Sequence, residues 1–468
     1  MWLEILTAII GGSLALLLLA YLYFKKKYTF WTKRGVYQIE PTFPMGSMPE
    51  IFTKSKAGMD IFLDHAKEAG NLPYYGIYFF GGPFLMLKDP DLIRQVTIKD
   101  FDYFVDRNSA KFQNMLNGST KTDQIWSKQI SSATGETWKN LRTTFTPIFT
   151  AGKMKAMMVF IQESCQKLMN SMDKYAENGE SFEAKDCVGR YSMDTIASCA
   201  FGVDAQSFSN SDSKFVTYAK NLFQQDFGQV MKLMMCMFVP FGRKILNTLG
   251  KSTFFKDMET EFFYEVLLES LKQRRQSKIR RNDLVDLMLD AIKGDLDQEE
   301  ENEDNDDQFD IDAQLTNDSG KKGGEFDELV IVATAIILLV AGYDTTGTTL
   351  AYCCYQLAKN PDIQDRLRNE IENQTNDQDD LITYDQVQTM TYLDQIISEV
   401  LRLHNPASIL QRSANKDYQI PNTDLVIPKG TGVWINGVAV HMDPKHYETP
   451  QVFNPEHFSK EAKAKRHP

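Results

Sequence analysis

The sequence predicts a mainly helical protein with a minor β region, built as a single large domain around a long central helix, with an N-terminal transmembrane helix in front. Most segments between residues 136 and 290 place apolar residues at helical spacing, which favours packed helices. The apolar run from Leu329 to Gly342 lies inside a continuous helical pattern over 326–358, which predicts the central helix. Short β-branched runs separated by turn residues over 406–445 predict the strands.

The composition indicates a globular protein with one strongly acidic segment. The chain has 468 residues, of which 43% are hydrophobic and 24% are charged, enough to form a large core. The formal net charge of -12 arises mostly from the tract Asp295 to Asp312, which holds eleven acidic residues and no basic one. Such a block repels itself and stays solvated, so we expect a flexible acidic loop over 294–324. The rest of the chain is close to neutral, which argues against a nucleic-acid surface.

Residues 1–27 are expected to anchor the protein in a membrane. Positions 5–24 carry no charge over twenty residues, which is the length that a helix needs to cross a bilayer. The basic cluster Lys25 to Lys27 follows the apolar run, and the positive-inside rule then leaves the rest of the chain in the cytosol. Prolines in the next segment predict a stiff linker over 28–50, followed by the main domain over 51–468.

Three other stretches carry predictions of secondary structure. Residues 74–100 alternate in polarity around Gly-Gly-Pro and predict a hairpin followed by a short helix. Residues 384–403 have the spacing of a helix. The Met-rich stretch from Lys232 to Leu246 fits either a core helix, which is slightly favoured, or an amphipathic segment that dips into a bilayer.

The central helix carries polar residues beside its apolar run, in the stretch AGYDTT over 341–346. An unpaired carboxylate or hydroxyl inside a protein is costly, so Asp344 and Thr345 should either pair locally or face a wet functional cavity. Gly342 permits the close approach of a ligand or of another backbone. Thr345 can donate to the carbonyl of Ala341 and bend the helix. Together these groups could pass protons into an apolar pocket.

The stretch AGYDTT resembles the oxygen-activating motif of the cytochrome P450 family, and three more motifs occur in the family's order. Glu399 and Arg402, in EVLR, match the structural E-x-x-R motif, whose two residues can pair on one helix face. Trp138 and Arg142, in WKNLR, match W-x-x-x-R and share a helical face. FNPEHF resembles the P-E-R-F segment, with His457 where Arg is usual. The resemblance covers essentially the whole chain and looks especially like the animal microsomal branch, families 3 and 6.

The resemblance implies a haem-dependent monooxygenase. Proteins of those families use haem b, iron protoporphyrin IX, to insert one oxygen atom of O2 into a lipophilic drug, toxin or steroid. The implied electron source is NADPH through a flavoprotein reductase, with a small b-type cytochrome as a further candidate partner. The implied location is the membrane of the endoplasmic reticulum, crossed once, with the catalytic domain in the cytosol.

The same resemblance carries individual roles over to matching positions. Asp344 and Thr345 would be the catalytic residues that deliver protons at the oxygen-binding side. Trp138, Arg142 and Arg107, the last in YFVDRNSA, would bind the haem propionates. The substrate pocket is expected to be lined by Ala335, Ala341 and Ile409.

One family feature is expected outside this sequence. In the family, a Cys in an F-x-x-G-x-R-x-C-x-G loop shortly after the P-E-R-F segment binds the haem iron. The chain reaches Pro468 before such a loop, and the last two of its six cysteines, Cys353 and Cys354, lie on the central helix itself. We therefore expect no metal ligand within these residues, an axial Cys beyond Pro468 and a C-terminally incomplete sequence. A catalytically silent, membrane-anchored homologue that binds lipids or a partner remains the alternative.

Overall fold

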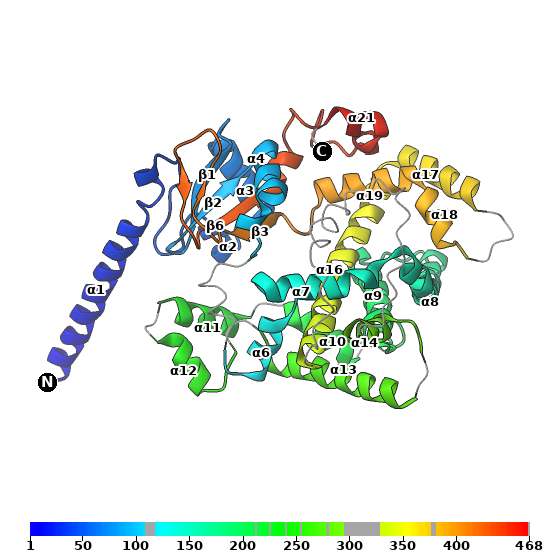
Figure 1. The fold of residues 1–468 in the computed structure, drawn as a ribbon, viewed down its shortest axis with the longest axis horizontal. Coiled ribbons are helices and arrows are strands. Elements are labelled where there is room, and N and C mark those ends of the chain that lie inside the picture. Colours follow the sequence, from blue (N-terminus) through cyan, green and yellow to red (C-terminus); the bar gives the residue numbers. More distant parts are fainter. Residues whose placement is uncertain are drawn as a thin grey trace. The chain divides into compact units, whose positions relative to one another are not determined.

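The computed structural model describes residues 1–107, 118–210, 213–223, 226–238, 241–252, 255–277, 280–293, 328–375 and 381–466 (Figure 1). The acidic loop expected over 294–324 lies outside these described residues. The chain divides into two compact units, each described by itself below. Unit 1 comprises Met1–Ser109, Ala407–Val452 and Lys460–Pro468, and unit 2 comprises Ala110–Pro406 and Phe453–Ser459.

Unit 1 combines a small β-sheet with short helices and the N-terminal helix. Its helices are α1 (Trp2–Lys27), α2 (Pro49–Thr53), α3 (Gly58–Glu68), α4 (Pro90–Arg94), α20 (Gly437–His441) and α21 (Lys460–Lys465), with the short turns η1 (Thr32–Arg34), η2 (Gln95–Lys99) and η3 (Phe101–Tyr103). Its strands are β1 (Tyr74–Phe79), β2 (Gly82–Leu87), β3 (Ile409–Ser413), β4 (Tyr418–Gln419), β5 (Val426–Ile427) and β6 (Gly432–Asn436).

The main sheet of unit 1 has four strands in the order β1-β2-β6-β3. β1 and β2 form an antiparallel hairpin, β6 runs parallel to β2, and β3 runs antiparallel to β6. β4 and β5 form a separate antiparallel pair. The predicted hairpin, the short helix after it and the late strands are therefore confirmed.

Both faces of this sheet are covered at β2, where successive side chains point to opposite sides. Leu85 and Leu87 of β2 belong to one apolar cluster together with Trp31. Met86, between them, belongs to a second cluster together with Phe62 of α3. The sheet is thus the central layer of unit 1.

Residues 28–50, expected to form a linker, are instead part of this packed unit. Trp31 is fully buried, and its indole nitrogen donates to the carbonyl of Ile77 at 3.3 Å. Gly76 makes room for the indole, since a Cβ at this position would lie 2.3 Å from the ring. Prolines stiffen the segment, but the apolar residues between them remove enough surface from water to hold it against the sheet.

Helix α1 is long and apolar enough to cross a membrane, judged by length and composition. Its last turns join unit 1 through aromatic rings: Phe24 contacts Phe43 edge-on with centroids 5.4 Å apart, and Tyr28 at 5.8 Å. Helix α16 of unit 2 passes the same test of length and composition, although its first half is buried in protein.

Unit 2 is a helical unit across its described residues. Its longer elements are α6 (Lys121–Lys128), α7 (Gly135–Phe145), α8 (Ala151–Asn178), α9 (Ala184–Ile196), α10 (Lys214–Phe223), α11 (Phe227–Phe238), α12 (Gly242–Thr248), α13 (Asp257–Ser277), α14 (Leu284–Lys293), α16 (Glu328–Lys359), α17 (Pro361–Gln374), α18 (Tyr384–Thr389) and α19 (Thr391–Leu403). Three short turns, η4 (Thr146–Phe149), η5 (Ala197–Phe201) and η6 (Pro455–Phe458), complete the set.

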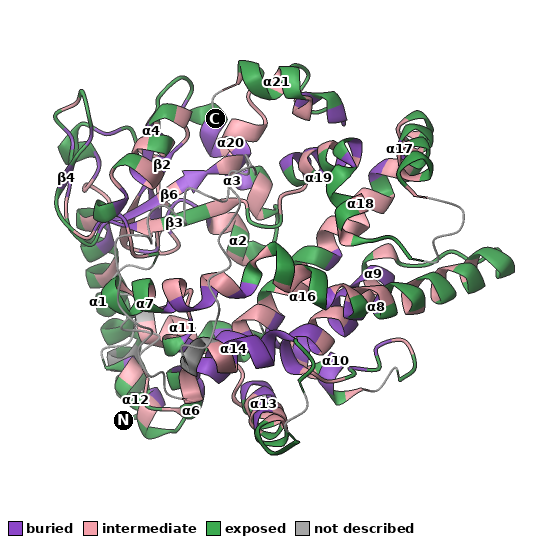
Figure 2. Ribbon diagram, turned by 45° about the vertical axis from the view of Figure 1, so that its right-hand side comes forward, coloured by how far each residue is buried: buried purple, intermediate pink, exposed green. Residues whose placement is uncertain are grey.

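Helix α16 is the predicted long central helix. Its 32 residues span roughly 48 Å at 1.5 Å per residue. Residues 331–336 are all buried and join the largest apolar cluster of the protein, whereas Ala341, Thr345 and Thr346 are exposed (Figure 2). Helix α9 packs along α16, and α6, α13 and α19 also contact it. The helix therefore changes from buried to accessible along its length.

The helix predicted over 384–403 is two helices, α18 and α19, separated at Met390. The backbone N–H groups of Tyr392 and Leu393 donate to the Glu370 carboxylate at 2.7 and 2.9 Å. The Glu370 carboxylate thus accepts from backbone N–H groups in the first turn of α19, which have no partner within the helix. This stabilises the start of a second helix after Met390.

The stretch from Lys232 to Leu246 falls in α11 and α12 rather than in one core helix. Its exposed apolar side chains include Phe241, 72% exposed, and Ile245, 43% exposed. Only the other face of α12 is internal, with Leu246 buried. The slightly favoured expectation of a core helix does not hold for α12, because its apolar residues lie on both faces.

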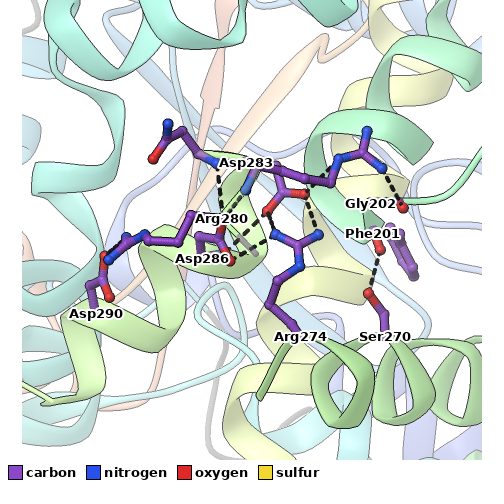
Figure 3. Close-up of polar contacts among 10 residues, drawn as sticks. Phe201, Gly202, Ser270, Arg274, Arg280, Asp283, Asp286 and Asp290 are labelled. Atoms are coloured by element: carbon purple, nitrogen blue, oxygen red, sulfur yellow. Dashed lines mark hydrogen bonds and ion pairs between the residues drawn. The ribbon is translucent and has the colours of Figure 1, made fainter. Parts of the chain in front are cut away.

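A buried charge network joins the end of α13 to the start of α14 (Figure 3). The Arg274 guanidinium lies 3.0 and 2.8 Å from the two carboxylate oxygens of Asp283, and 2.7 Å from Asp286. Asp283 is fully buried and Asp286 is 4% exposed. Burial works against the charge on Arg274, but hydrogen bonds to both carboxylates raise its pKa on balance.

Candidate functional site

The polar turn of α16 has the local bond that the sequence predicts. The Thr345 hydroxyl donates to the carbonyl of Ala341 at 2.5 Å, and Thr349 repeats the pattern one turn later, donating to the carbonyl of Thr345 at 2.9 Å. Such back-bonding adds a second donor to a helix carbonyl and bends helices slightly. Thr345 itself is exposed, so its hydroxyl is accessible to a bound molecule.

Asp344 is paired across the helix interface. Its carboxylate lies 3.2 Å from the ammonium of Lys185 on α9, and both side chains are about half exposed. An ion pair with this exposure contributes little to stability, so Asp344 is held only loosely by Lys185. Burial, followed by the charges of Asp344 and Asp186, raises the pKa of Tyr343 to about 12, so its phenol stays neutral near pH 7.

The α9–α16 crossing is unusually close at two glycines of α16. A Cβ on Gly342 would lie 3.0 Å from the Ile196 side chain. The absence of a side chain at this position therefore allows α9 to approach α16 closely, as the sequence suggested. A Cβ on Gly347 would lie 3.1 Å from the Ser192 hydroxyl and 3.3 Å from the Cα of Gly189. The two backbones are therefore in near contact beside the acid and hydroxyl of α16.

The E-x-x-R pair forms the centre of a buried cluster on α19. The Glu399 carboxylate accepts two bonds of 2.7 Å from Arg402, and the exposed fractions of these side chains are 0% and 1%. The same carboxylate accepts the N–H of Asn454 at 2.9 Å and contacts Nδ1 of His457 at 3.1 Å. A buried ion pair needs such additional partners. His457 thus takes part in the cluster although Arg is usual at its position.

The other expected site residues occupy separate places. Trp138 and Arg142 are half-buried and one turn apart on α7 of unit 2. Arg107 is exposed in unit 1, so a shared role with the α7 pair stays a prediction.

The three residues expected to line the substrate pocket are equally dispersed. Ala335 is packed in the core of unit 2 at 1% exposure, whereas Ala341 is exposed. Ile409 is the first residue of β3 in unit 1 and packs against the apolar cluster that contains Met86. A common pocket formed by these residues stays a prediction.

The residues of this chain fit one side of a haem better than the other. An accessible hydroxyl on α16 suits the oxygen side, and an indole and a guanidinium on one turn of α7 suit propionates. Burial raises the pKa of Cys199 and of Cys353 to about 11, which favours the neutral thiol at these two positions. Within the described residues, no group of three or more His, Cys, Asp or Glu side chains could hold a metal ion.

Three residues at these places were not predicted from the sequence. Lys185 and Ser192 contact α16 from more than 150 positions away, which local patterns do not reveal. A turn at Asn454 could have been predicted from the sequence, because Asn before Pro favours a turn. In the structure its side chain accepts the N–H of Glu456 at 3.1 Å.

Comparison with known proteins agrees with this fold and these motifs. The sequence profile described as Cytochrome P450 matches residues 41–468. The chain is 32% identical over 454 residues to "Cytochrome P450 6k1" of Blattella germanica, covering 96% of this chain and 82% of the relative. It is 33% identical over 456 residues to "Cytochrome P450 6a2" of Drosophila melanogaster, covering 96% and 84%. It is 32% identical over 475 residues to "Cytochrome P450 6B7" of Helicoverpa armigera, covering 100% and 86%.

Together, the helical fold, the polar turn of α16 and these similarities define an oxidoreductase of the monooxygenase class, with haem as the implied cofactor. The chain belongs to the cytochrome P450 family. Its similarity to insect members of family 6 confirms the branch that the sequence motifs indicated.

Proposed function

We propose that this protein is a haem b-dependent monooxygenase that inserts one oxygen atom of O2 into a lipophilic xenobiotic or steroid-like substrate. Its electrons come from NADPH through a flavoprotein reductase, and a small b-type cytochrome is a second candidate donor. The substrate class rests on the resemblance to families 3 and 6 and on the similarity to insect family-6 proteins. The single observation that carries the proposal is the accessible Thr345 hydroxyl beside Asp344, on a helix of this family's fold.

The proposal places the protein in the membrane of the endoplasmic reticulum, held by α1 as a single span. The length and apolar composition of α1, with the lysines at its end, support this placement. The exposed apolar residues of α12 support a second contact with the bilayer surface. In this arrangement a lipophilic substrate reaches the protein from the membrane.

Bound haem would supply the oxygen activation and C–H oxidation, as cofactors do in such enzymes. The proposal assigns its propionates to Trp138, Arg142 and Arg107, which offer an N–H and two guanidinium groups. Thr345 gives a proton-bearing oxygen already oriented by the Ala341 carbonyl. In this proposal the first three residues bind the haem propionates, and Thr345 presents an oriented hydroxyl.

Proton supply is assigned to Asp344. Its carboxylate is about half exposed and paired with Lys185, so water can reach it. Thr345 is the next residue along the helix and can pass a proton inward while its carbonyl partner keeps the hydroxyl in one rotamer. The acid and the hydroxyl therefore act as successive steps of one relay.

The decisive experiment compares Thr345→Ala with Thr349→Ala in the haem-loaded protein, assayed with NADPH, reductase and the probe 7-ethoxycoumarin. Both threonines make the same back-bond on α16, one turn apart, so the control preserves helix context. Thr345→Ala should raise hydrogen peroxide formed per NADPH several-fold, while Thr349→Ala stays near the parent protein. Equal peroxide yields in the two variants would remove the proposed role of Thr345.

The spectrum of the reduced protein with carbon monoxide separates the two functional alternatives. A Soret band at the thiolate position supports the monooxygenase. A folded protein without any haem band supports the silent homologue.

A further inference from the structure

We propose that Ser192 of α9 is a positioning residue for the Asp344–Thr345 pair, an inference that rests on the function proposed above. Ser192 is 3% exposed and lies on the face of α9 that meets α16. Its hydroxyl oxygen is 3.0 Å from the carbonyl oxygen of Tyr343. That carbonyl belongs to the peptide group that leads directly into Asp344.

Ser192 is part of a stripe along one face of α9. Lys185, Gly189 and Ser192 are spaced by four and three residues, so they share a helical face. Each contacts α16 near the polar turn: Lys185 holds the carboxylate of Asp344, Gly189 lets the backbones meet, and Ser192 holds the preceding peptide. These residues of α9 therefore contact Asp344 at its side chain and also hold the peptide group that precedes it.

The Lys185–Asp344 ion pair and the Ser192–Tyr343 hydrogen bond differ in strength, and the hydrogen bond is the more important of the two. The Lys185–Asp344 pair is about half exposed, and such pairs contribute little. The Ser192 bond is part-buried and its donor side chain is only 3% exposed, so solvent competes with it less than with the ion pair. Its single proton is shared between the Tyr343 carbonyl and the Gly189 carbonyl of its own helix, 3.1 Å away.

The close crossing explains why a serine suits this position. A Cβ on Gly347 would already lie 3.1 Å from the hydroxyl, so a larger side chain at 192 would push the helices apart. A smaller one would leave the Tyr343 carbonyl without its donor from α9. The peptide group before Asp344 would then lose one of the contacts that fix the acid and the hydroxyl relative to α9.

The first test measures backbone opening by hydrogen–deuterium exchange on the full chain, which needs no haem. Ser192→Ala should speed exchange of the amides over 343–349 by about three- to tenfold, the range expected for one lost hydrogen bond. The matched control is Ser164→Ala on α8, since Ser164 is also 3% exposed but donates within its own helix, to Phe160 at 2.9 Å. Exchange over 343–349 should be unchanged in this control.

The second test measures coupling in the haem-loaded protein with NADPH, reductase and 7-ethoxycoumarin. Ser192→Ala should raise hydrogen peroxide formed per NADPH at least twofold, in the same direction as Thr345→Ala, whereas Ser164→Ala should match the parent. A merely structural effect would lower the melting temperature of both serine variants without changing this ratio.

The outcomes separate the inference from the function on which it rests. Faster exchange together with higher peroxide yield supports the positioning role. If Thr345→Ala uncouples the enzyme but Ser192→Ala behaves like Ser164→Ala in both tests, the positioning role is overturned and the proposed function stands. If neither Thr345→Ala nor Ser192→Ala changes the peroxide yield, the proposed relay through Thr345 and the positioning role of Ser192 are both overturned.

Discussion

Replacing Glu399 by Gln should destabilise unit 2 by about 3 kcal/mol. The substitution keeps the shape of the side chain but removes the carboxylate that two 2.7 Å bonds join to Arg402, which is 1% exposed. A buried charge without its partner costs about 3–5 kcal/mol, and the lower end applies here because the Gln carbonyl can still accept a hydrogen bond. For a unit of this size, about 3 kcal/mol lowers the melting temperature by roughly 5 °C.

The assay is thermal unfolding followed by circular dichroism, with Glu456→Gln as the matched control. Glu456 pairs with Arg366 at 2.5 Å close to the same cluster, but both side chains are about half exposed. Exposed pairs contribute about 0–1 kcal/mol, so the control should lose no more than roughly 2 °C. Equal shifts in the two variants would show that burial does not determine the contribution of the Glu399 pair.

Three further changes test the packing and the pH response of the fold. Arg274→Met should destabilise the protein by about 3–5 kcal/mol in urea unfolding, because the fully buried Asp283 loses its two short bonds to Arg274 and keeps only the longer 3.6 Å ion pair with Arg281; a loss under 1 kcal/mol would contradict this. Gly76→Ala should destabilise unit 1 by at least about 1–3 kcal/mol, since the new Cβ would lie 2.3 Å from a buried indole, whereas Gly58→Ala, whose Cβ would meet a ring at 3.9 Å, should change stability little. Burial holds the pKa of His65 below its usual 6.5, so the unfolded chain gains its proton first and stability falls as pH drops below about 6.5. His65→Phe should reduce this loss between pH 7 and pH 5, and an unchanged pH profile would refute the assignment.

Local patterns in the sequence predicted much of the fold, because helices and hairpins are encoded by nearby residues. The spacing of apolar residues revealed α16, and alternation around Gly-Gly-Pro revealed the β1–β2 hairpin. The back-bond of Thr345 was predictable for the same reason, since its partner is four residues away.

Contacts between distant segments were not predictable in this way. Proline content suggested a linker over 28–50, but Trp31 lies against Ile77 because both sides of the sheet need apolar cover. Nothing near Asp344 in the sequence indicated Lys185 as its partner. The place of His457 in the Glu399 cluster likewise depends on how η6 returns to α19.

The aromatic junction between α1 and unit 1 has a consequence for how a bilayer would act on the protein. Phe24 is 7% exposed and contacts both Phe43 and Tyr28. These contacts restrict rotation of α1 relative to the rest of unit 1. A transmembrane helix adjusts its tilt to the thickness of the surrounding lipid. With α1 spanning a bilayer as proposed above, such a tilt would be passed on to the sheet through these rings, and lipid composition would thereby influence the orientation of unit 1.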